Sequence, residues 1–334
     1  TEPILKDLGD FEFRARAGAL LNEIASISKT LWLNKNFPES KKAKHFLSAP
    51  EWVAYSLGAE IVNELSLVSR TGFFDVESRK PWEEAIALVG GGKDYLGRLV
   101  VAGEPIGIVN NQAPENLRGA VITIAGHDHF TAAYYCGAIN EGSLFDSMGT
   151  AEALLRTFKA PLTREAIAEL AAANVGLSCS VIADHYTLLG ALPTGLTLER
   201  ACALVGVATR EEKIALGEAA LKIDPSASAM RVVNDYHGLS VTNLDDAVSP
   251  AALFRATVEH LVDDSSEMVA LIEKFTGKAQ NVVIAGGWIN NPVIAAAKEK
   301  QYGSFRVSDA TEAGATGAAE FAGIAAGIFQ LKNS

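Results

Sequence analysis

The sequence predicts an α/β protein of two domains. Its 334 residues exceed the roughly 100–200 residues of a typical domain. Two apolar runs, VITIAG at 121–126 and VVIAGG at 282–287, end in glycine and lead into helical patterns, which is typical of buried strands. Because the runs recur in the two halves of the chain, two α/β halves of similar plan would explain them.

The first half is expected to be largely helical before its strands begin. Apolar residues recur at intervals of three and four over 14–36, which predicts an amphipathic helix. Three glycines at 90–92 supply the positive φ of a helix stop. The expected elements are helices over 14–36, 50–65 and 82–89, strands over 106–109 and 120–126, and a helix over 130–139.

The second half begins again with strands, which suggest an antiparallel set. Its longest helix has Ser249 as the expected N-cap and Pro250 at the first helical position. The terminal helix is dense in Ala and Gly and must pack closely against a neighbour. The expected elements are strands over 143–147, 148–157, 185–192, 281–287 and 305–308, and helices over 197–206, 210–222, 249–275, 292–301 and 312–329.

Composition and charge exclude two classes of binding partner, nucleic acid and membrane. The formal net charge is −11, with no run of Lys or Arg, so nucleic acid is not expected to bind. No apolar stretch approaches the roughly 20 residues that span a bilayer, and the N-terminal sequence has no secretory signal, so no membrane partner is expected. Cys136, Cys179 and Cys202 form no CxxC pair, which predicts a reduced, cytoplasmic chain without a thiolate metal site.

Asp128 is the first candidate for chemistry. It follows the expected strand over 120–126, and ligands bind at the carboxyl ends of strands in open α/β sheets. A carboxylate there can accept the proton of a substrate hydroxyl, which is the base role in phosphoryl transfer. Asp is also a favoured helix N-cap, and its position leaves that alternative open.

Glycine-containing turns are further candidates. The turn at 147–151 exposes backbone N–H groups and the Thr150 hydroxyl, which can hold phosphate oxygens, although a plain hairpin has the same features. Gly286 and Gly287 would let a ring or a phosphate approach the backbone, or would close a tight turn. Gly314 and Gly317 would open the same pocket or allow close helix packing.

A metal site and a set of aromatic residues complete the candidates. His127 and His129 flank Asp128 as in metal-dependent hydrolases, with His185 and His237 as the remaining candidate ligands. The patterns GxxxxGK[ST], GxGxxG, HExxH and GxSxG are absent. The four tryptophans are expected in the core or in a cleft wall: Trp32, Trp52, Trp82 and Trp288.

In their order, these segments resemble the FGGY family of carbohydrate kinases, which includes xylulokinase, gluconokinase and glycerol kinase. SKTLWLNKNFPES is similar to the family's Ser-x-Lys-x-x-Trp segment, apart from Thr30, and FLSAPEWVAYSLGAEIVNELSLVSRTGFFDVESRKPW is similar to the stretch that ends in TG…D…W. VITIAGHDHFTAAYYCGAI resembles the segment of the catalytic Asp, and SMGTAEA resembles the Gly-Thr phosphate loop. VVIAGGWINNPVIAAA and DATEAGATGAAEFAGIAAG resemble the nucleotide-binding Gly-Gly segment and the terminal helix.

The resemblance implies two ribonuclease-H-like α/β domains of the actin/hexokinase (ASKHA) plan, with a cleft between them. Residues 1–139 would be the remaining part of domain I, on the sugar side, and 140–334 domain II, on the nucleotide side. The family's N-terminal strand and its Asp-x-Gly-Thr loop have no counterpart here, so we expect the first domain to be incomplete. The family's Gly-Glu-Arg-x-Pro loop is replaced by SASAMRVVNDYHGLSVTN at 226–243.

The activity implied by the resemblance is ATP-dependent phosphorylation of a sugar or polyol hydroxyl. Asp128 would be the general base, and His129 would line the substrate site beside it. Mg²⁺ would accompany ATP, held by waters and by the absent loop, so no metal-binding residue is assigned in this chain. The expected nucleotide contacts are Gly149, Thr150, Gly195, Glu199, Gly287 and Asn291.

Two other classes remain open, a non-catalytic actin-fold relative and a metal-dependent hydrolase that uses His127 and His129. We expect the 334 residues alone to be inactive if the phosphate- and metal-holding loop is truly absent. A homodimer is not excluded, and the sequence does not identify the sugar.

Overall fold

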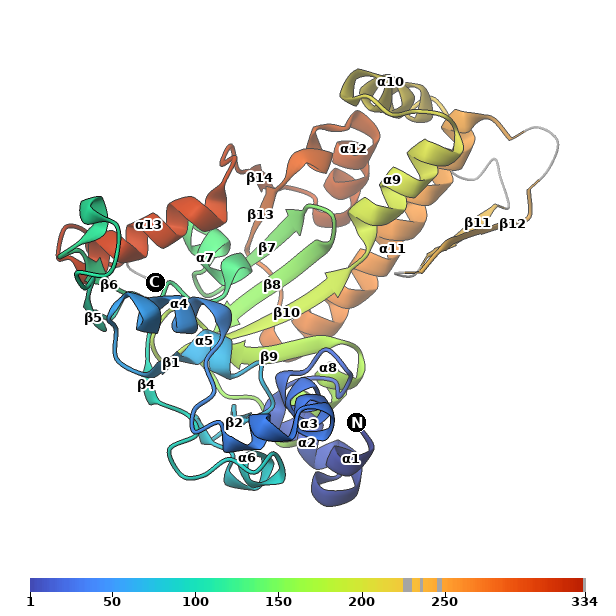
Figure 1. Ribbon diagram of the computed structural model, residues 1–334. Helices are drawn as coiled ribbons and strands as arrows, with labels where there is room; N and C mark the ends of the chain where they lie inside the picture. The colour runs from blue at the N-terminus through green and yellow to red at the C-terminus, as the bar shows by residue number, and fades with distance from the viewer. Residues whose placement is uncertain (225–229, 235–236, 245–247, 333–334) are drawn as a thin grey trace. The chain divides into compact units, whose positions relative to one another are not determined.

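The computed structural model describes residues 1–224, 230–234, 237–244 and 248–332, and it divides into two compact units (Figure 1). Unit 1 comprises Thr1–Glu141, Arg156–Leu189 and Glu312–Ser334, and unit 2 comprises Gly142–Leu155 and Gly190–Thr311. The predicted α/β class is confirmed. The functional boundary between residues 139 and 140 stays a prediction.

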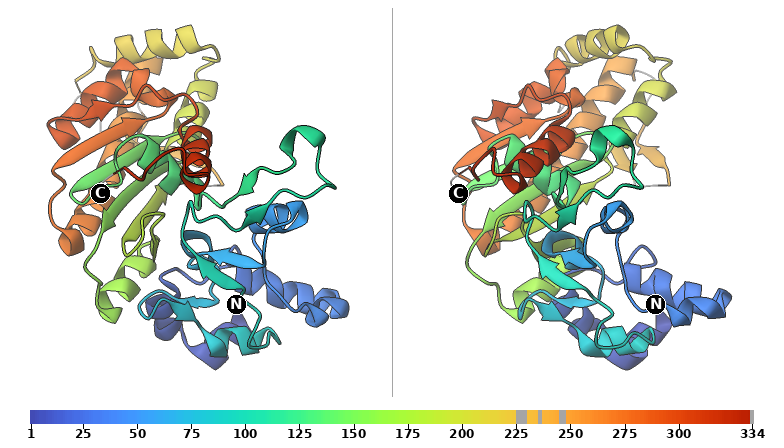
Figure 2. Two further views of the ribbon diagram at one scale, coloured as in Figure 1. Left: turned by 90° about the vertical axis from the view of Figure 1, so that its left-hand side faces the viewer. Right: turned by 60° about the vertical axis from the view of Figure 1, so that its left-hand side comes forward.

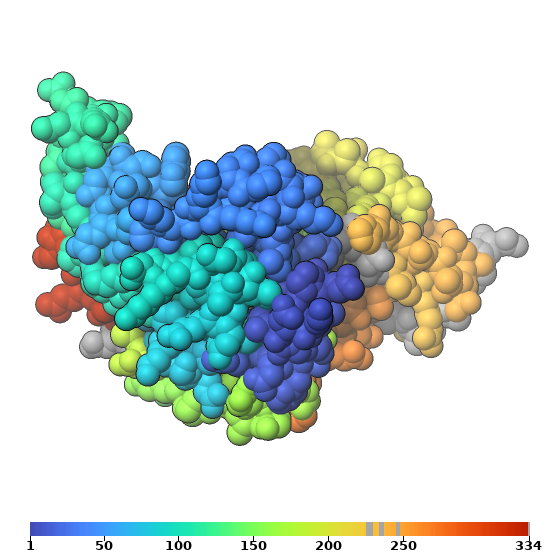
Figure 3. Space-filling view, turned by 60° about the horizontal axis from the view of Figure 1, so that its bottom comes forward, coloured from blue at the N-terminus to red at the C-terminus, as the bar shows by residue number. Residues whose placement is uncertain are grey.

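Unit 1 combines short helices with two-stranded sheets. β1 and β4 pair in parallel, whereas β2–β3 and β5–β6 are antiparallel. Figures 2 and 3 show the segment around η2, between β5 and β6, projecting from the surface of this unit. Its elements are α1 (Glu2–Leu8), α2 (Asp10–Ala17), α3 (Ser26–Asn36), η1 (Pro38–Lys42), α4 (Ala49–Leu57), β1 (Val62–Glu64), α5 (Leu65–Val68), β2 (Phe74–Asp75), β3 (Lys80–Pro81), α6 (Glu83–Leu88), β4 (Arg98–Val100), β5 (Gly107–Ile108), η2 (Glu115–Leu117), β6 (Val121–Ile122), α7 (Asp128–Tyr135), α8 (Arg164–Ala172), β9 (Val175–Cys179) and α13 (Ala313–Ala325).

Three expected elements of unit 1 are wrong in extent. The helix over 14–36 is interrupted, because Gly18 ends α2 with a φ of 61° and an added Cβ would lie 2.3 Å from the Leu177 carbonyl oxygen. The helix over 50–65 ends at Leu57, and Val62–Glu64 form β1 instead. The buried strand over 120–126 shrinks to the two residues of β6, which pair only with β5.

Unit 2 is built on the larger sheet, whose strand order is β14-β13-β7-β8-β10-β9. The division between the units falls within β8 and β10. β13 is parallel to both of its neighbours, β7 and β14. The elements are β7 (Ser143–Met148), β8 (Glu152–Phe158), β10 (Tyr186–Leu192), α9 (Thr194–Leu204), α10 (Arg210–Ala220), β11 (Arg231–Asn234), β12 (Leu239–Thr242), α11 (Pro250–Thr276), β13 (Asn281–Ala285), η4 (Gly287–Asn290), α12 (Pro292–Tyr302) and β14 (Arg306–Val307).

The helices of unit 2 enclose one apolar core. α9 and α12 both pack against α11 (Figure 1). Met148 and Ile284 from the sheet meet Leu198, Phe254 and Ile294 from the three helices, and all five side chains are buried. The expected caps of the long helix are confirmed, because the Ser249 hydroxyl accepts a hydrogen bond from the Ala252 N–H at 3.1 Å and Pro250 follows it.

Three further features are the segment over 226–243, the cysteines and the apolar character of the helices. Of the segment that replaces the family loop, 226–229 and 235–236 lie outside the described residues, and β11 and β12 form an antiparallel pair. Cys136, Cys179 and Cys202 all lie among the described residues with buried side chains, and no disulfide bond joins them. Among the described residues, no helix combines the length and the apolar character needed to cross a membrane.

Candidate active site

Asp128 is the first residue of α7 and lies at the surface of unit 1, with 81% of its side chain exposed. His127 occupies the N-cap position and its side chain makes no capping hydrogen bond, so the alternative of Asp128 as the N-cap is wrong. Oδ1 of Asp128 lies 3.0 Å from Nδ1 of His127 and accepts a hydrogen bond from the His129 N–H at 2.8 Å. The interaction with His127 holds the pKa of Asp128 well below its usual range, so the carboxylate is ionised at neutral pH.

A buried carboxyl group supports the turn before Asp128. Gly126 has a φ of 89°, and an added Cβ would lie 2.5 Å from the Ser66 hydroxyl oxygen. That hydroxyl accepts a hydrogen bond from the His127 N–H at 2.9 Å and donates one to the Glu64 carboxyl at 2.5 Å. Burial raises the pKa of Glu64 to about 7.

Of the two glycines of α13 singled out in the sequence, Gly317 allows close packing against α7. An added Cβ on Gly317 would lie only 2.5 Å from the Thr131 carbonyl oxygen of α7. One on Gly314 would lie 3.7 Å from the carbonyl oxygen of Asp128. The structure therefore confirms the packing interpretation for Gly317, whereas the contact at Gly314 is an ordinary one.

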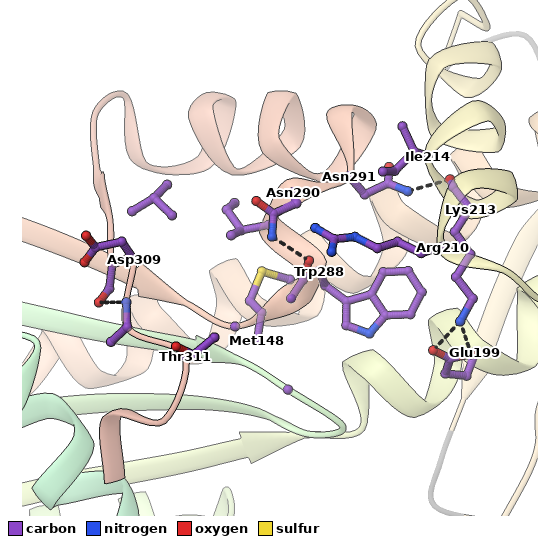
Figure 4. A pocket seen from close by; sticks show the side chains of 17 residues that line it. Met148, Glu199, Arg210, Lys213, Ile214, Trp288, Asn290, Asn291, Asp309 and Thr311 are labelled. Carbon is purple, nitrogen blue, oxygen red and sulfur yellow. Dashed lines mark hydrogen bonds and ion pairs between the residues drawn. The ribbon is translucent and has the colours of Figure 1, made fainter. Parts of the chain in front are cut away.

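Unit 2 contains a cavity of about 960 Å³, shown in Figure 4. It lies among the β7–β8 turn, α9, α10, the turn after β13 and the segment that follows β14. Its lining residues are Met148, Gly149, Glu199, Arg210, Lys213, Ile214, Gly286, Gly287, Trp288, Ile289, Asn290, Asn291, Val307, Ser308, Asp309, Ala310 and Thr311.

Four of the six expected nucleotide contacts line this cavity: Gly149, Glu199, Gly287 and Asn291. The other two, Thr150 and Gly195, do not line it. Gly195 lies beneath the β7–β8 turn, where an added Cβ would be 1.9 Å from the Gly149 carbonyl oxygen. The carbonyl of Thr150 accepts a hydrogen bond from the Leu196 N–H at 2.9 Å. α9 therefore forms the floor of the expected phosphate turn.

The two glycines after β13 differ in their surroundings. Gly286 has a φ of 107°, and an added Cβ would lie 2.3 Å from the Met148 carbonyl oxygen. Gly287 lines the cavity, and no atom of the described residues lies within 4 Å of a Cβ added to it. Gly286 is thus required by the turn, whereas Gly287 leaves open space that a ligand can fill.

The polar side chains at the α10 wall of the cavity bond mainly to one another. Both carboxylate oxygens of Glu199 accept hydrogen bonds from the Lys213 ammonium, each at 2.7 Å, and this ammonium lies 5.4 Å from the Trp288 ring centroid. The Asn291 amide donates to the Lys213 carbonyl at 2.8 Å, and its oxygen accepts from the Val293 N–H at 3.3 Å. Figure 4 shows the Arg210 side chain extending toward Trp288. Asn291 therefore fixes α10 to α12, so that α10 walls the cavity.

Sequence reasoning missed the basic and aromatic lining of the cavity. Arg210 and Lys213 appear in the sequence only as polar residues of a predicted helix, and Trp288 only as a core or cleft residue. The one signal that could have singled out Trp288 is its place directly after Gly286 and Gly287. The residues proposed for a metal site are not joined by further ligands, because no three His, Cys, Asp or Glu side chains converge on a common point in the described parts of the chain.

Comparison with known proteins shows a likeness to one family of kinases. Residues 2–134 match the N-terminal domain of the FGGY family of carbohydrate kinases. The chain is 27% identical over 194 residues to a gluconokinase of Bacillus subtilis (strain 168), an alignment that covers 56% of this chain and 36% of that protein. The chain thus spans about a third of the length of this curated relative.

Solved structures show the same fold along almost the whole chain. A xylulose kinase from Rhodospirillum rubrum superposes with a TM-score of 0.85 at 16% identity, covering 97% of this chain and 68% of that one. A glycerol kinase from Plasmodium falciparum, solved with ADP, superposes with a TM-score of 0.82 at 17% identity, covering 96% and 67%. These likenesses confirm the predicted two-domain actin/hexokinase plan as the fold of this chain, and residues 2–134 are similar in sequence to the N-terminal domain of the FGGY family of carbohydrate kinases.

Proposed function

We propose that this protein phosphorylates a hydroxyl group of a sugar or polyol with ATP. The observation that carries the proposal is the cavity of unit 2, which is lined by expected nucleotide contacts from three separate segments of the chain. Gly149 comes from the β7–β8 turn, Glu199 from α9, and Gly287 and Asn291 from η4 and the N-cap of α12.

The cavity has the chemistry that a nucleotide needs. The Trp288 ring offers an aromatic face to a base, and Arg210 supplies a cation for the phosphates. The open space at Gly287 lets the ligand approach the backbone. Support also comes from the glycerol kinase of Plasmodium falciparum, which was solved with ADP.

Asp128 is proposed as the general base for the substrate hydroxyl, with His129 beside it. Its carboxylate is exposed and ionised, so it can accept the hydroxyl proton as the oxygen attacks the γ-phosphorus of ATP. The lowered pKa makes Asp128 a weak base, which this reaction tolerates because phosphoryl transfer depends mainly on positioning and on charge stabilisation.

Mg²⁺ is proposed as the companion of ATP. Mg²⁺ usually keeps several waters and takes one or two carboxylates together with the phosphates of its substrate. The described residues fit this limited demand, since Asp309 offers an exposed carboxylate at the cavity and no cluster of three acidic or imidazole ligands is present among them. The ion would neutralise charge on the phosphates.

The finer assignments remain part of the same proposal. The gluconokinase similar to this chain points to sugar acids as one substrate class. The xylulose kinase and the glycerol kinase of similar fold point to ketoses and polyols. A cytoplasmic location rests on the three buried cysteines, which form no disulfide bond and suit a reducing compartment. The association of two copies into a homodimer is tested with the same purified protein.

The test combines binding with turnover. Calorimetry measures ATP binding to the 334-residue chain, and ADP release is measured with a panel of ketoses, aldonates and polyols. The assay is run on this chain and on a version extended at its N-terminus. Sugar-dependent ADP release by either form supports the proposal. ATP binding without ADP release by either form would favour the non-catalytic relative, and absence of both would refute the proposal.

A further inference from the structure

A fully buried ionic cluster lies at the base of the β7–β8 turn. Asp146 and Glu152 flank the turn on its two strands, and Lys298 reaches them from α12. The Lys298 ammonium lies 2.8 Å from Oδ2 of Asp146 and 2.5 Å from Oε1 of Glu152. The three side chains are at most 1% exposed. One ammonium therefore binds both strands that lead into the turn.

Neutral side chains extend the cluster to the neighbouring helices. The Thr194 hydroxyl of α9 donates to Oε2 of Glu152 at 2.6 Å, and the Ser265 hydroxyl of α11 donates to Oε1 at 2.7 Å. The Tyr302 hydroxyl of α12 donates to Oδ2 of Asp146 at 2.9 Å. Five elements of unit 2 thus meet at two carboxylates and one ammonium.

Stability alone does not account for this arrangement. Two carboxylates share one cation, so the ionised cluster carries a net negative charge without access to water. Oδ1 of Asp146 has no hydrogen-bond partner among the described residues, and burial raises the pKa of that carboxyl to about 6. Replacing a buried ionic cluster with packed apolar side chains is often neutral or stabilising.

We propose that Lys298 is a positioning residue that holds the β7–β8 turn, and with it Gly149, in place for the phosphates of the nucleotide. The inference rests on the proposed function. Lys298 belongs to α12, which follows Gly286 and Gly287 after the short helix η4. The start of α12 therefore positions the turn at Gly286 and Gly287, and the Lys298 side chain of the same helix positions the β7–β8 turn.

The contacts beneath the turn point the same way. α9 touches the turn through Gly195 and Leu196, and the position of its first residue, Thr194, is set by Glu152 of the cluster. A turn whose N–H groups are to hold phosphate oxygens must keep its backbone fixed before the ligand binds. Lys298 and the first turn of α9 fix it from two sides.

The test separates the phosphates from the rest of the nucleotide. Lys298→Met removes the ammonium with little change in shape, and we expect ATP affinity to fall at least about tenfold, the scale of a charge-assisted contact to phosphate, while adenosine affinity changes less than about twofold. Lys300→Met is the matched control, because Lys300 lies two residues away on the same helix with 77% of its side chain exposed. It should change neither affinity.

A second variant covers the case in which Lys298→Met does not fold. Asp146→Asn releases the strand before the turn, keeps the Tyr302 contact and leaves Lys298 paired with Glu152. We expect its amides at 147–151 to exchange hydrogen at least about tenfold faster than in the wild type, while those of β13 stay unchanged.

Two results would overturn the inference. One is wild-type ATP affinity and wild-type exchange in folded variants, and the other is a parallel loss of ATP and adenosine binding. If the wild type binds neither ligand, the proposed function fails, and the exchange of the turn still decides whether Lys298 positions it.

Discussion

The turns at Gly126 in unit 1 and Gly286 in unit 2 use the same local geometry with different support. Each follows an apolar run, each has a positive φ, and neither has room for a Cβ. Beneath Gly126 lies the Ser66 hydroxyl, bonded to the buried Glu64, whereas beneath Gly286 lies the backbone of Met148. One turn rests on a group that can gain or lose a proton, and the other rests on a strand.

The strands before the two turns differ as well. β6 contributes two residues to a two-stranded antiparallel sheet, whereas the five residues of β13 lie between β7 and β14 in the large sheet. An apolar run that ends in glycine therefore predicts the turn reliably, but it does not predict how much of the run is paired. The features that follow the two turns differ as well, because an exposed carboxylate follows the first turn and an open cavity follows the second.

The largest expected effect tests whether the unit 1 turn is the chemical one. Asp128→Asn keeps the size of the side chain but cannot accept the hydroxyl proton, so turnover should fall about 10²–10⁴-fold. Sugar-dependent ADP release measures it, in whichever form of the protein is active. Asp94→Asn, at another exposed carboxylate of unit 1, is the control. Near-native turnover of the Asp128 variant would remove the assignment.

The two glycines themselves give the next largest effect. Gly126→Ala and Gly286→Ala should each lower the free energy of unfolding by about 2–4 kcal/mol, because both combine a positive φ with a close contact. Urea unfolding measures the loss, with Gly287→Ala as the control that meets open space. If only one of the two variants is destabilised, the likeness of the turns is superficial.

The difference in support predicts a difference in pH dependence. The pKa of Glu64 is raised from 4.5 to about 7 by burial, and the nearby Glu51 carboxylate adds to the rise. The folded state therefore binds the proton more tightly, and this contribution to stability is lost as pH rises from about 4.5 to about 7. The loss amounts to at most about 3 kcal/mol.

Glu64→Gln should remove this part of the pH dependence, so that the variant gains relative to the wild type as pH rises. Unfolding midpoints at pH 5, 6, 7 and 8 measure it, and the exposed Glu39→Gln is the control. A constant difference between Glu64→Gln and the wild type across this range would show that Glu64 titrates alike in the folded and unfolded states.

The smallest expected effect concerns the open side of the unit 2 turn. Gly287→Val places a branched side chain in the cavity, so ATP affinity should fall about tenfold or more, while stability changes by less than about 0.5 kcal/mol. Calorimetry and thermal unfolding measure the two quantities. A large loss of stability with unchanged affinity would mean that Gly287 serves only the turn.

The sequence predicted those elements whose signals are local. The long helix α11 follows from Ser249 and Pro250, and the turn after β13 follows from its two glycines. The break at Gly18 could not be predicted, because its cause is the backbone at Leu177, far away in the chain. β9 and α8 were missed altogether. The pairing of β9 at the edge of the sheet depends on tertiary contacts.

The candidate site divides in the same way. Glycines and Asp128 stand out because their position after an apolar run has a direct physical meaning. Lys298 and Lys300 look alike in AAAKEKQ, yet one is buried between two carboxylates and the other is exposed. Only the packing of α12 against β7 and β8 distinguishes them, so the cluster could not be found from the sequence.

Each unit contains a buried thiol whose rate of alkylation depends on how often its surroundings open. Burial raises the pKa of Cys179 in unit 1 and of Cys202 in unit 2 to about 11, so that about one thiol in ten thousand is ionised at pH 7. Alkylating reagents react with the thiolate, and each side chain is shielded in the folded state. The labelling rate of each cysteine therefore reports how often its surroundings open, so the opening of the two units can be timed separately in one sample without introducing a new residue.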